Sequence, residues 1–173
     1  MKVTLFAVVT FTIGIALSCA PADSSGSEDI VLKMIEAVNS RDFDALDTLV
    51  AADVRRYSGA TPDVHVRSLD DFKAFLHTDL AAVPDAMQDV NRIFSSGDMV
   101  AVHVTYSGTQ DGQMGPFPPS HRRVELPFIG LLRVEDGKIA EIWVEWDNLS
   151  VLAQLGHFPP PGMVPEEEVQ GIE

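Results

Sequence analysis

The spacing of apolar residues changes once along the chain, and this change limits the folds open to the sequence. Between residues 28 and 84, apolar side chains recur mainly at steps of three and four, as in amphipathic helices. Between residues 87 and 146, β-branched and aromatic residues dominate and turn residues separate their runs. Helices followed by consecutive strands predict an α+β fold, with helices against one face of a curved antiparallel sheet.

The first half of this pattern contains recognisable boundaries. Two helices are expected within residues 28–50, and Ser40 or Asp42 can cap the second one by accepting free N–H groups of its first turn. Residues 53–66 combine β-prone residues with glycine and proline, which predicts a short strand and a loop. A third helix is expected over residues 68–83, because the proline that follows disfavours helix in the residue before it.

The second half ends in a predicted hairpin. Residues 122–134 and 138–146 are β-prone and flank Glu135-Asp136-Gly137, in which glycine suits the left-handed third position of a three-residue loop. A Gly- and Pro-rich loop is expected over residues 111–120, and a short helix over residues 148–155.

The register of this hairpin predicts two unlike faces. With Val134 opposite Lys138, Glu125 lies opposite Asp147, and side chains alternate between faces. One face is mixed and typical of a binding site: it carries Glu125, Ile129, Leu131, Arg133, Glu141, Trp143, Glu145 and Asp147. The other is apolar: it carries Leu126, Phe128, Leu132, Ile142, Val144 and Trp146. Because large exposed apolar patches are rare, we expect a homodimer through this apolar face, or else a cover formed by residues 158–164.

The N-terminus is typical of an export signal. An apolar run over residues 3–17 follows Lys2 and is too short for a stable membrane span. It ends in Ala16-Leu17-Ser18-Cys19, which resembles the bacterial lipobox, so Cys19 is the predicted lipidation site. The predicted divisions are a signal peptide (1–18), a flexible tether (19–27), the folded domain (28–158) and a C-terminal tail (159–173).

This division predicts a lipoprotein of the cell envelope, held at a membrane by its lipid alone. The alternative is an ordinary secretory peptide, in which case Cys19 has no special role and the protein is secreted.

Charge and residue counts disfavour several classes of partner. Twelve Lys and Arg against 26 Asp and Glu give a net charge of −14, which repels the nucleic-acid backbone. The five histidines show no metal-ligand spacing, so no metal site is predicted. A single cysteine excludes a disulfide within the chain.

Four segments together resemble one family. They are AVNSRDFDAL (37–46), VPD (83–85), GTQDGQMGPFPPSHRRVE (108–125) and VEDGKIAEIWVEWDNLSVLAQLG (134–156). This ordered set is similar to the SnoaL-like polyketide (ester) cyclases, a branch of the cone-shaped folds that include nuclear transport factor and ketosteroid isomerase. The resemblance implies a conical sheet with a deep pocket closed by the N-terminal helices, and it implies no cofactor.

The resemblance also implies a site. In the cyclases an Asp at the end of the last strand is the general acid/base of an intramolecular aldol closure, and Asp147 occupies that position. Gln110 and Ile142 stand where the family usually carries His, and His103 where it often carries Arg. The candidate substrate-binding residues are Gln110, Trp143, Arg133 and His103.

Simpler roles remain open for two of these residues. Asp147 can cap the helix that begins near Asn148, and Arg133 can form an ion pair with Glu141. The expected function is acid/base chemistry on a small hydrophobic carbonyl compound, by cyclisation, isomerisation or a related lyase reaction. The alternatives are a non-catalytic lipoprotein that binds small molecules and an interaction scaffold.

Overall fold

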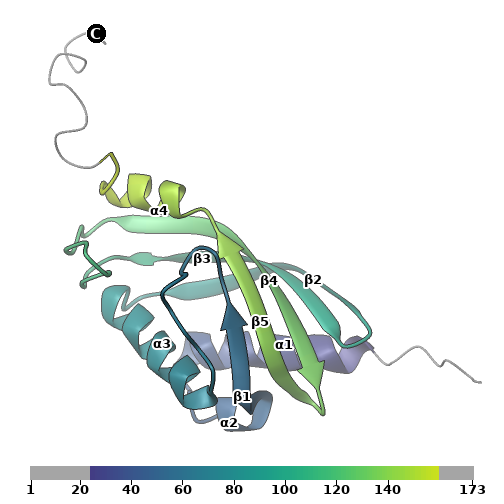
Figure 1. Ribbon diagram of the computed structural model, residues 1–173. Coiled ribbons are helices and arrows are strands. Elements are labelled where there is room, and N and C mark those ends of the chain that lie inside the picture. Colours follow the sequence, from purple (N-terminus) through teal and green to yellow (C-terminus); the bar gives the residue numbers. More distant parts are fainter. Residues whose placement is uncertain (1–23, 160–173) are drawn as a thin grey trace, which may run out of the picture.

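The computed structural model of the protein describes residues 24–159 (Figure 1). Its elements, in chain order, are α1 (Ser24–Ser40), α2 (Leu46–Leu49), β1 (Val50–Tyr57), α3 (Leu69–Ala82), β2 (Met87–Ser96), β3 (Met99–Thr109), β4 (Arg123–Glu135), β5 (Lys138–Trp146) and α4 (Asn148–Leu155). This order confirms the predicted change from helices to strands near residue 87 and the α+β class.

Two predicted boundaries need correction. Helix α1 begins at Ser24, so residues 24–27 are helical rather than part of a flexible tether. The second helix is a single short turn, α2, because the chain turns directly into β1 at Val50. The predicted signal peptide, Cys19 and the C-terminal tail beyond residue 159 lie outside the described residues. Within residues 24–159, no helix is both long and apolar enough to cross a membrane.

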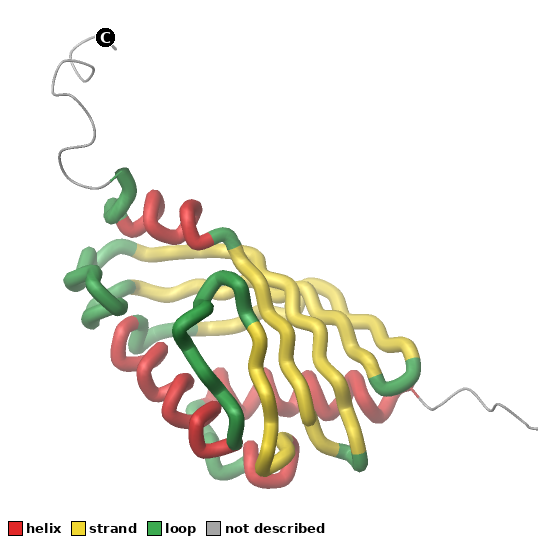
Figure 2. Tube along the Cα trace, in the orientation of Figure 1, coloured by secondary structure: helices red, strands yellow, loops and turns green. Residues whose placement is uncertain are grey.

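The sheet has five strands in the order β1-β5-β4-β3-β2 and is mixed rather than wholly antiparallel. The pairs β2–β3, β3–β4 and β4–β5 are antiparallel, whereas β1 pairs parallel with β5. The exception follows from the path of the chain. β1 precedes α3, which carries the chain to the opposite edge, so the first strand meets the last one without a hairpin between them (Figure 2).

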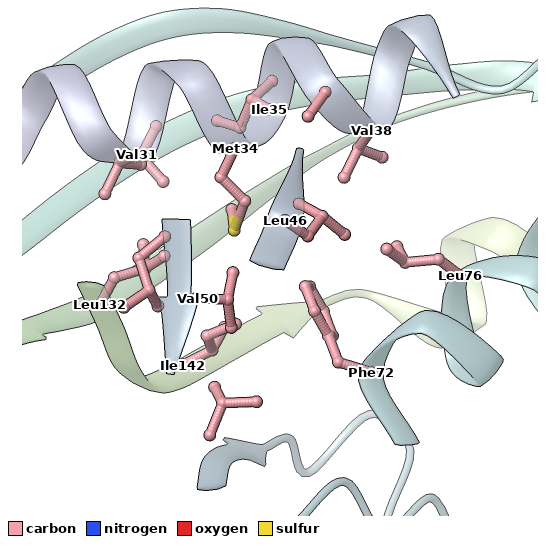
Figure 3. Packing of buried hydrophobic residues seen from close by; sticks show 14 of the residues in the cluster. Val31, Met34, Ile35, Val38, Leu46, Val50, Phe72, Leu76, Leu132 and Ile142 are labelled. Carbon is pink, nitrogen blue, oxygen red and sulfur yellow. The ribbon is translucent and has the colours of Figure 1, made fainter. Parts of the chain in front are cut away.

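Helices α1 and α3 lie on the same face of the curved sheet, and α4 lies at one end of it (Figure 1). On α1, Val31, Met34, Ile35 and Val38 recur at steps of three and four, so they form one buried stripe (Figure 3). This stripe meets Leu46 of α2, Val50 of β1, and Phe72 and Leu76 of α3 (Figure 3). Burying each of these side chains contributes about 1.5–3 kcal/mol, which holds the helices against the sheet.

The register of the β4–β5 hairpin differs from the predicted one by two residues at its open end. The loop has two residues, Asp136 and Gly137, both with positive φ, and Glu135 pairs with Lys138. A bulge follows, so that Arg133 pairs with Glu141 instead of Ile139. Phe128 therefore pairs with Trp146. A shift of two residues leaves every side chain on its predicted face, because side chains alternate with period two.

The two faces have the opposite roles to those predicted. The apolar set, which includes Phe128 and Trp146, faces α1 and α3, whereas the mixed set lies on the outer face of the sheet. The reason is physical: the helices pack on the face that most needs to be removed from water. The helices therefore cover the face through which a homodimer was expected, so that face is not available as an interface, and the homodimer itself stays a prediction.

Candidate functional site

A cavity of about 200 Å³ lies between the inner face of the sheet and helices α1, α3 and α4. Most of its lining is aliphatic and aromatic, from all the longer strands and from each of these helices. Four polar side chains interrupt this apolar surface: Arg56, Asp79, Gln88 and Tyr106. A largely apolar pocket with a few convergent polar groups is the usual form of a small-molecule site.

Asp79 lies on the side of α3 that faces the sheet. It is seven residues after Phe72 and three after Leu76, both of which are buried, so helical periodicity turns its carboxyl group toward the pocket. The Tyr106 hydroxyl lies 3.3 Å from Oδ1 and 3.2 Å from Oδ2 and donates a hydrogen bond to the carboxyl group. The hydrogen bond from Tyr106 thus holds the carboxyl group in a defined orientation among apolar side chains.

Burial raises the pKa of Asp79 to about 6, because removal from water disfavours the charged form. The hydrogen bond from Tyr106 and the positive charges of Arg41 and Arg56 act in the opposite direction and limit this rise. A carboxyl group with such a pKa exists in both forms near neutral pH, as a general acid or base must.

Tyr106 comes from β3, where it follows Val102 and Val104 on the inner face. Burial, together with the negative charge of Asp79, raises the pKa of Tyr106 well above its usual range. The hydroxyl therefore keeps its proton and remains a hydrogen-bond donor to Asp79.

Arg56 is the most deeply buried charged group of the pocket, with 7% of its surface exposed. It lies on β1, two residues after the fully buried Val54, so strand alternation points it inward. Its guanidinium carbon lies 4.5 Å from the centre of the Phe75 ring and 5.7 Å from that of Trp146. One of its N–H groups donates to the Thr61 hydroxyl at 2.9 Å.

Asp147 does not lie in the pocket, contrary to the prediction. Trp146 is the last inward residue of β5, and Asp147 follows it as the N-cap of α4. Its exposed carboxylate accepts hydrogen bonds from the N–H groups of Leu149 at 2.9 Å and Ser150 at 3.1 Å. The capping alternative is confirmed.

Trp143, Arg133 and His103 lie on the outer face, away from the pocket. Trp143 stacks on Tyr57 with ring centres 5.3 Å apart. Arg133 pairs with Glu141 at 2.5 Å, which confirms the alternative role predicted for it, and with Glu135 at 2.8 Å. His103 is opposite Ile129, also on that face. The predicted placement of these residues around a substrate is wrong because the helices cover the other face.

Gln110 is fully buried, but its amide is engaged in holding two segments together. Its Nε2 donates to the carbonyl oxygens of Gly112 at 3.1 Å and Pro118 at 2.9 Å. Its Oε1 lies 2.9 Å from Nε2 of His157, whose ring stacks on Phe117. Gln110 thus joins the loop after β3 to the segment after α4, and it is not part of the pocket lining.

Comparison with known proteins identifies the family of this chain. The family model for SnoaL-like polyketide cyclases matches residues 28–155, which is most of the chain. The chain belongs to the SnoaL-like polyketide cyclase family. No curated protein shows significant similarity to this SnoaL-like chain.

Solved structures with the same fold agree with this assignment. TsrD from Streptomyces laurentii is 27% identical, with a TM-score of 0.70 over 78% of this chain and 98% of TsrD. IdmH from Streptomyces antibioticus is 31% identical, with a TM-score of 0.68 over 75% of this chain and 98% of IdmH. A SnoaL-like protein from Jannaschia sp. CCS1 is 22% identical, with a TM-score of 0.71 over 79% of this chain and 95% of that one, and shows the shared fold.

The sequence analysis missed two charged residues in the pocket of this SnoaL-like chain. Asp79 occupies a position of the apolar stripe of α3, and Arg56 occupies an inward position of β1. A charged residue at a position where periodicity calls for an apolar one is the signal that could have found both. In the described part of this SnoaL-like chain, His, Asp and Glu form no cluster of three or more that could hold a metal ion.

Proposed function

We propose that this SnoaL-like protein performs acid/base chemistry on a small, largely apolar carbonyl compound of the polyketide-like class, and that Asp79 transfers the proton. The observation that carries this proposal is the Asp79 carboxyl group inside an apolar cavity, held by the Tyr106 hydroxyl at 3.2–3.3 Å. Family membership supports the cyclase-type class of reaction. Cyclisation, isomerisation and related lyase reactions share the step that this geometry favours.

That step is the removal of a proton from the carbon beside a carbonyl group. The Asp79 carboxylate takes the proton, and the electron pair of the C–H bond moves onto the carbonyl oxygen to form an enolate. Protonated Asp79 then returns the proton to the product. The Tyr106 hydrogen bond orients Asp79 throughout, and the apolar lining keeps water from competing with the substrate.

The test is α-proton exchange in D₂O, followed by NMR for a panel of small apolar ketones and β-keto esters. At least one compound should exchange faster with the protein than in buffer. Asp79→Asn should lower this rate by about 100-fold or more, because it removes the proton acceptor. Asp147→Asn is the matched control and should keep most of the rate, since Asp147 lies outside the pocket. Equal loss in both variants would contradict the role of Asp79.

A second candidate is a non-catalytic binding protein that uses the same pocket. The observation in its favour is that Asp147, the residue at the position of the catalytic acid/base, caps α4 instead. This alternative predicts that ligands bind without any α-proton exchange in the unmodified protein. Export and lipidation at Cys19 stay predictions from the sequence.

A further inference from the structure

Arg56 carries a buried positive charge that no ion pair neutralises within residues 24–159. Two acidic residues are close enough to influence it, Glu145 and Asp79. Glu145 is engaged by the N–H groups of Gly59 at 2.6 Å and Ala60 at 3.1 Å. Asp79 is engaged by Tyr106. Because buried charges are normally paired, the state of Arg56 requires an explanation.

The surroundings of Arg56 leave the edge of its guanidinium group for a ligand. The rings of Phe75 and Trp146 lie near the group at 4.5 and 5.7 Å, as in cation–π contacts. A guanidinium group has five N–H donors, and among the described residues one of them donates to Thr61. Arg56 also belongs to the pocket lining, so a molecule in the cavity would lie beside this side chain.

We infer that the pocket binds a carboxylate ligand, with Arg56 donating hydrogen bonds to the carboxylate and the apolar lining holding a ring-bearing body. The guanidinium group of arginine can donate two parallel hydrogen bonds to the two oxygens of a carboxylate. A ketone has a single oxygen and cannot accept such a pair. Phe128 and Trp146 lie on the adjoining inner face and supply flat apolar surface for the body of the ligand.

This inference rests on the proposed function only in placing the ligand in the same pocket. It narrows the substrate class from apolar carbonyl compounds to those that also carry a carboxylate. Arg56 would then select the substrate, and Asp79, a separate group on α3, would transfer the proton.

The experiment compares 2-naphthoate with 2-naphthamide, which share the ring system and differ in charge, by isothermal titration calorimetry at pH 7. The unmodified protein should bind the acid about tenfold or more tightly than the amide, as expected for charge-assisted hydrogen bonds. Arg56→Met keeps an apolar stem beside Phe75 and should lose this preference while still binding the amide. Arg56→Lys keeps the charge without the fork and should retain part of the preference.

Arg133→Met is the matched control, because Arg133 lies on the outer face in ion pairs with Glu135 and Glu141. It should leave the preference for the acid unchanged. Equal binding of acid and amide by the unmodified protein, or an undiminished preference in Arg56→Met, would overturn the inference. Preference for the acid without α-proton exchange of any ketone, aryl keto acids included, would contradict the proposed function alone. Exchange of neutral ketones without this preference would contradict the inference alone.

Discussion

At Asp79, the proposed acid/base role requires a carboxyl group at a position where folding favours an apolar side chain. The apolar stripe of α3 continues from Phe72 and Leu76 to Val83, and a leucine at position 79 would fit it. Asp79 instead places a carboxyl group among apolar side chains, where the charged form is costly. The hydrogen bond from Tyr106 offsets part of that cost. A buried carboxyl group with a raised pKa inside a cavity is a candidate for a functional role.

We expect the raised pKa of Asp79 to make stability depend on pH. Between pH 4 and 6 the native protein holds a proton that the unfolded chain releases, because the pKa rises from 3.8 to about 6. This contribution is fully present below about pH 4 and is lost as the pH rises through about 6. Relative to Asp79→Asn, the free energy of unfolding of the unmodified protein should fall by about 1–3 kcal/mol from pH 4 to pH 7. Urea denaturation at several pH values measures it.

Tyr106→Phe is the companion variant. It removes a hydrogen bond that lowers the pKa of Asp79, so the loss of stability should move to higher pH. Identical pH dependence in the unmodified protein and in Asp79→Asn would show that Asp79 titrates as an ordinary surface carboxyl group.

At the scale of elements, the end of the pocket depends on how α4 is held. Val151 and Leu155 of α4 line the cavity, as does Met114 of the loop after β3. Neither segment is part of the sheet. Gln110 joins them through its contacts with that loop and with His157. The family position at which we expected a substrate contact therefore serves to close the pocket.

We expect Gln110→Leu, which has a similar volume, to loosen α4. The carbonyl oxygens of Gly112 and Pro118 and the ring of His157 would each lose a hydrogen-bond partner, at a cost of about 1–3 kcal/mol. Hydrogen–deuterium exchange should show faster exchange in α4, with β3 and β4 less affected. The control is Gln113→Leu in the same loop, because the exposed Gln113 bonds only Gly115 among the described residues. Unchanged hydrogen–deuterium exchange of α4 in Gln110→Leu would contradict the role of Gln110 in holding α4.

At the scale of the whole molecule, the outer face of the sheet carries a continuous apolar row. Successive strand pairings join Phe94 to Ala101, Ala101 to Leu131, Leu131 to Trp143 and Trp143 to Tyr57. Phe94 is 65% exposed, and Leu131 and Tyr57 are each 40% exposed. Exposed apolar rows of this kind are typical of an interface. We therefore predict a homodimer through the outer face instead of the inner one.

We expect the protein to elute as a dimer and Leu131→Glu to elute as a monomer, in size-exclusion chromatography with light scattering. A charge in the middle of the row would have to be buried without a partner in the dimer. Leu149→Glu is the matched control, because Leu149 is exposed on α4, which lies at the end of the sheet (Figure 1). A monomeric unmodified protein would contradict the dimer on either face.

The sequence by itself determined the order of most elements and which side chains share a face, because these depend on local periodicity. The step of three and four over α1, and the alternation over β4 and β5, set which side of each element is apolar. The face of each side chain was predicted correctly although the predicted register of β4 and β5 was wrong by two residues. The segments shared with the SnoaL-like cyclases also identified the family, which the family model confirmed.

Only the tertiary structure decided which face of the sheet encloses the site. The sequence shows that one face is mixed and the other apolar, but a mixed face suits either a pocket or a solvent-exposed surface. Packing of α1 and α3 resolved this in favour of the apolar face, and it placed Asp79 and Arg56, which are 23 positions apart in the sequence, in one cavity. Such a meeting depends on contacts between distant segments, which local patterns do not encode.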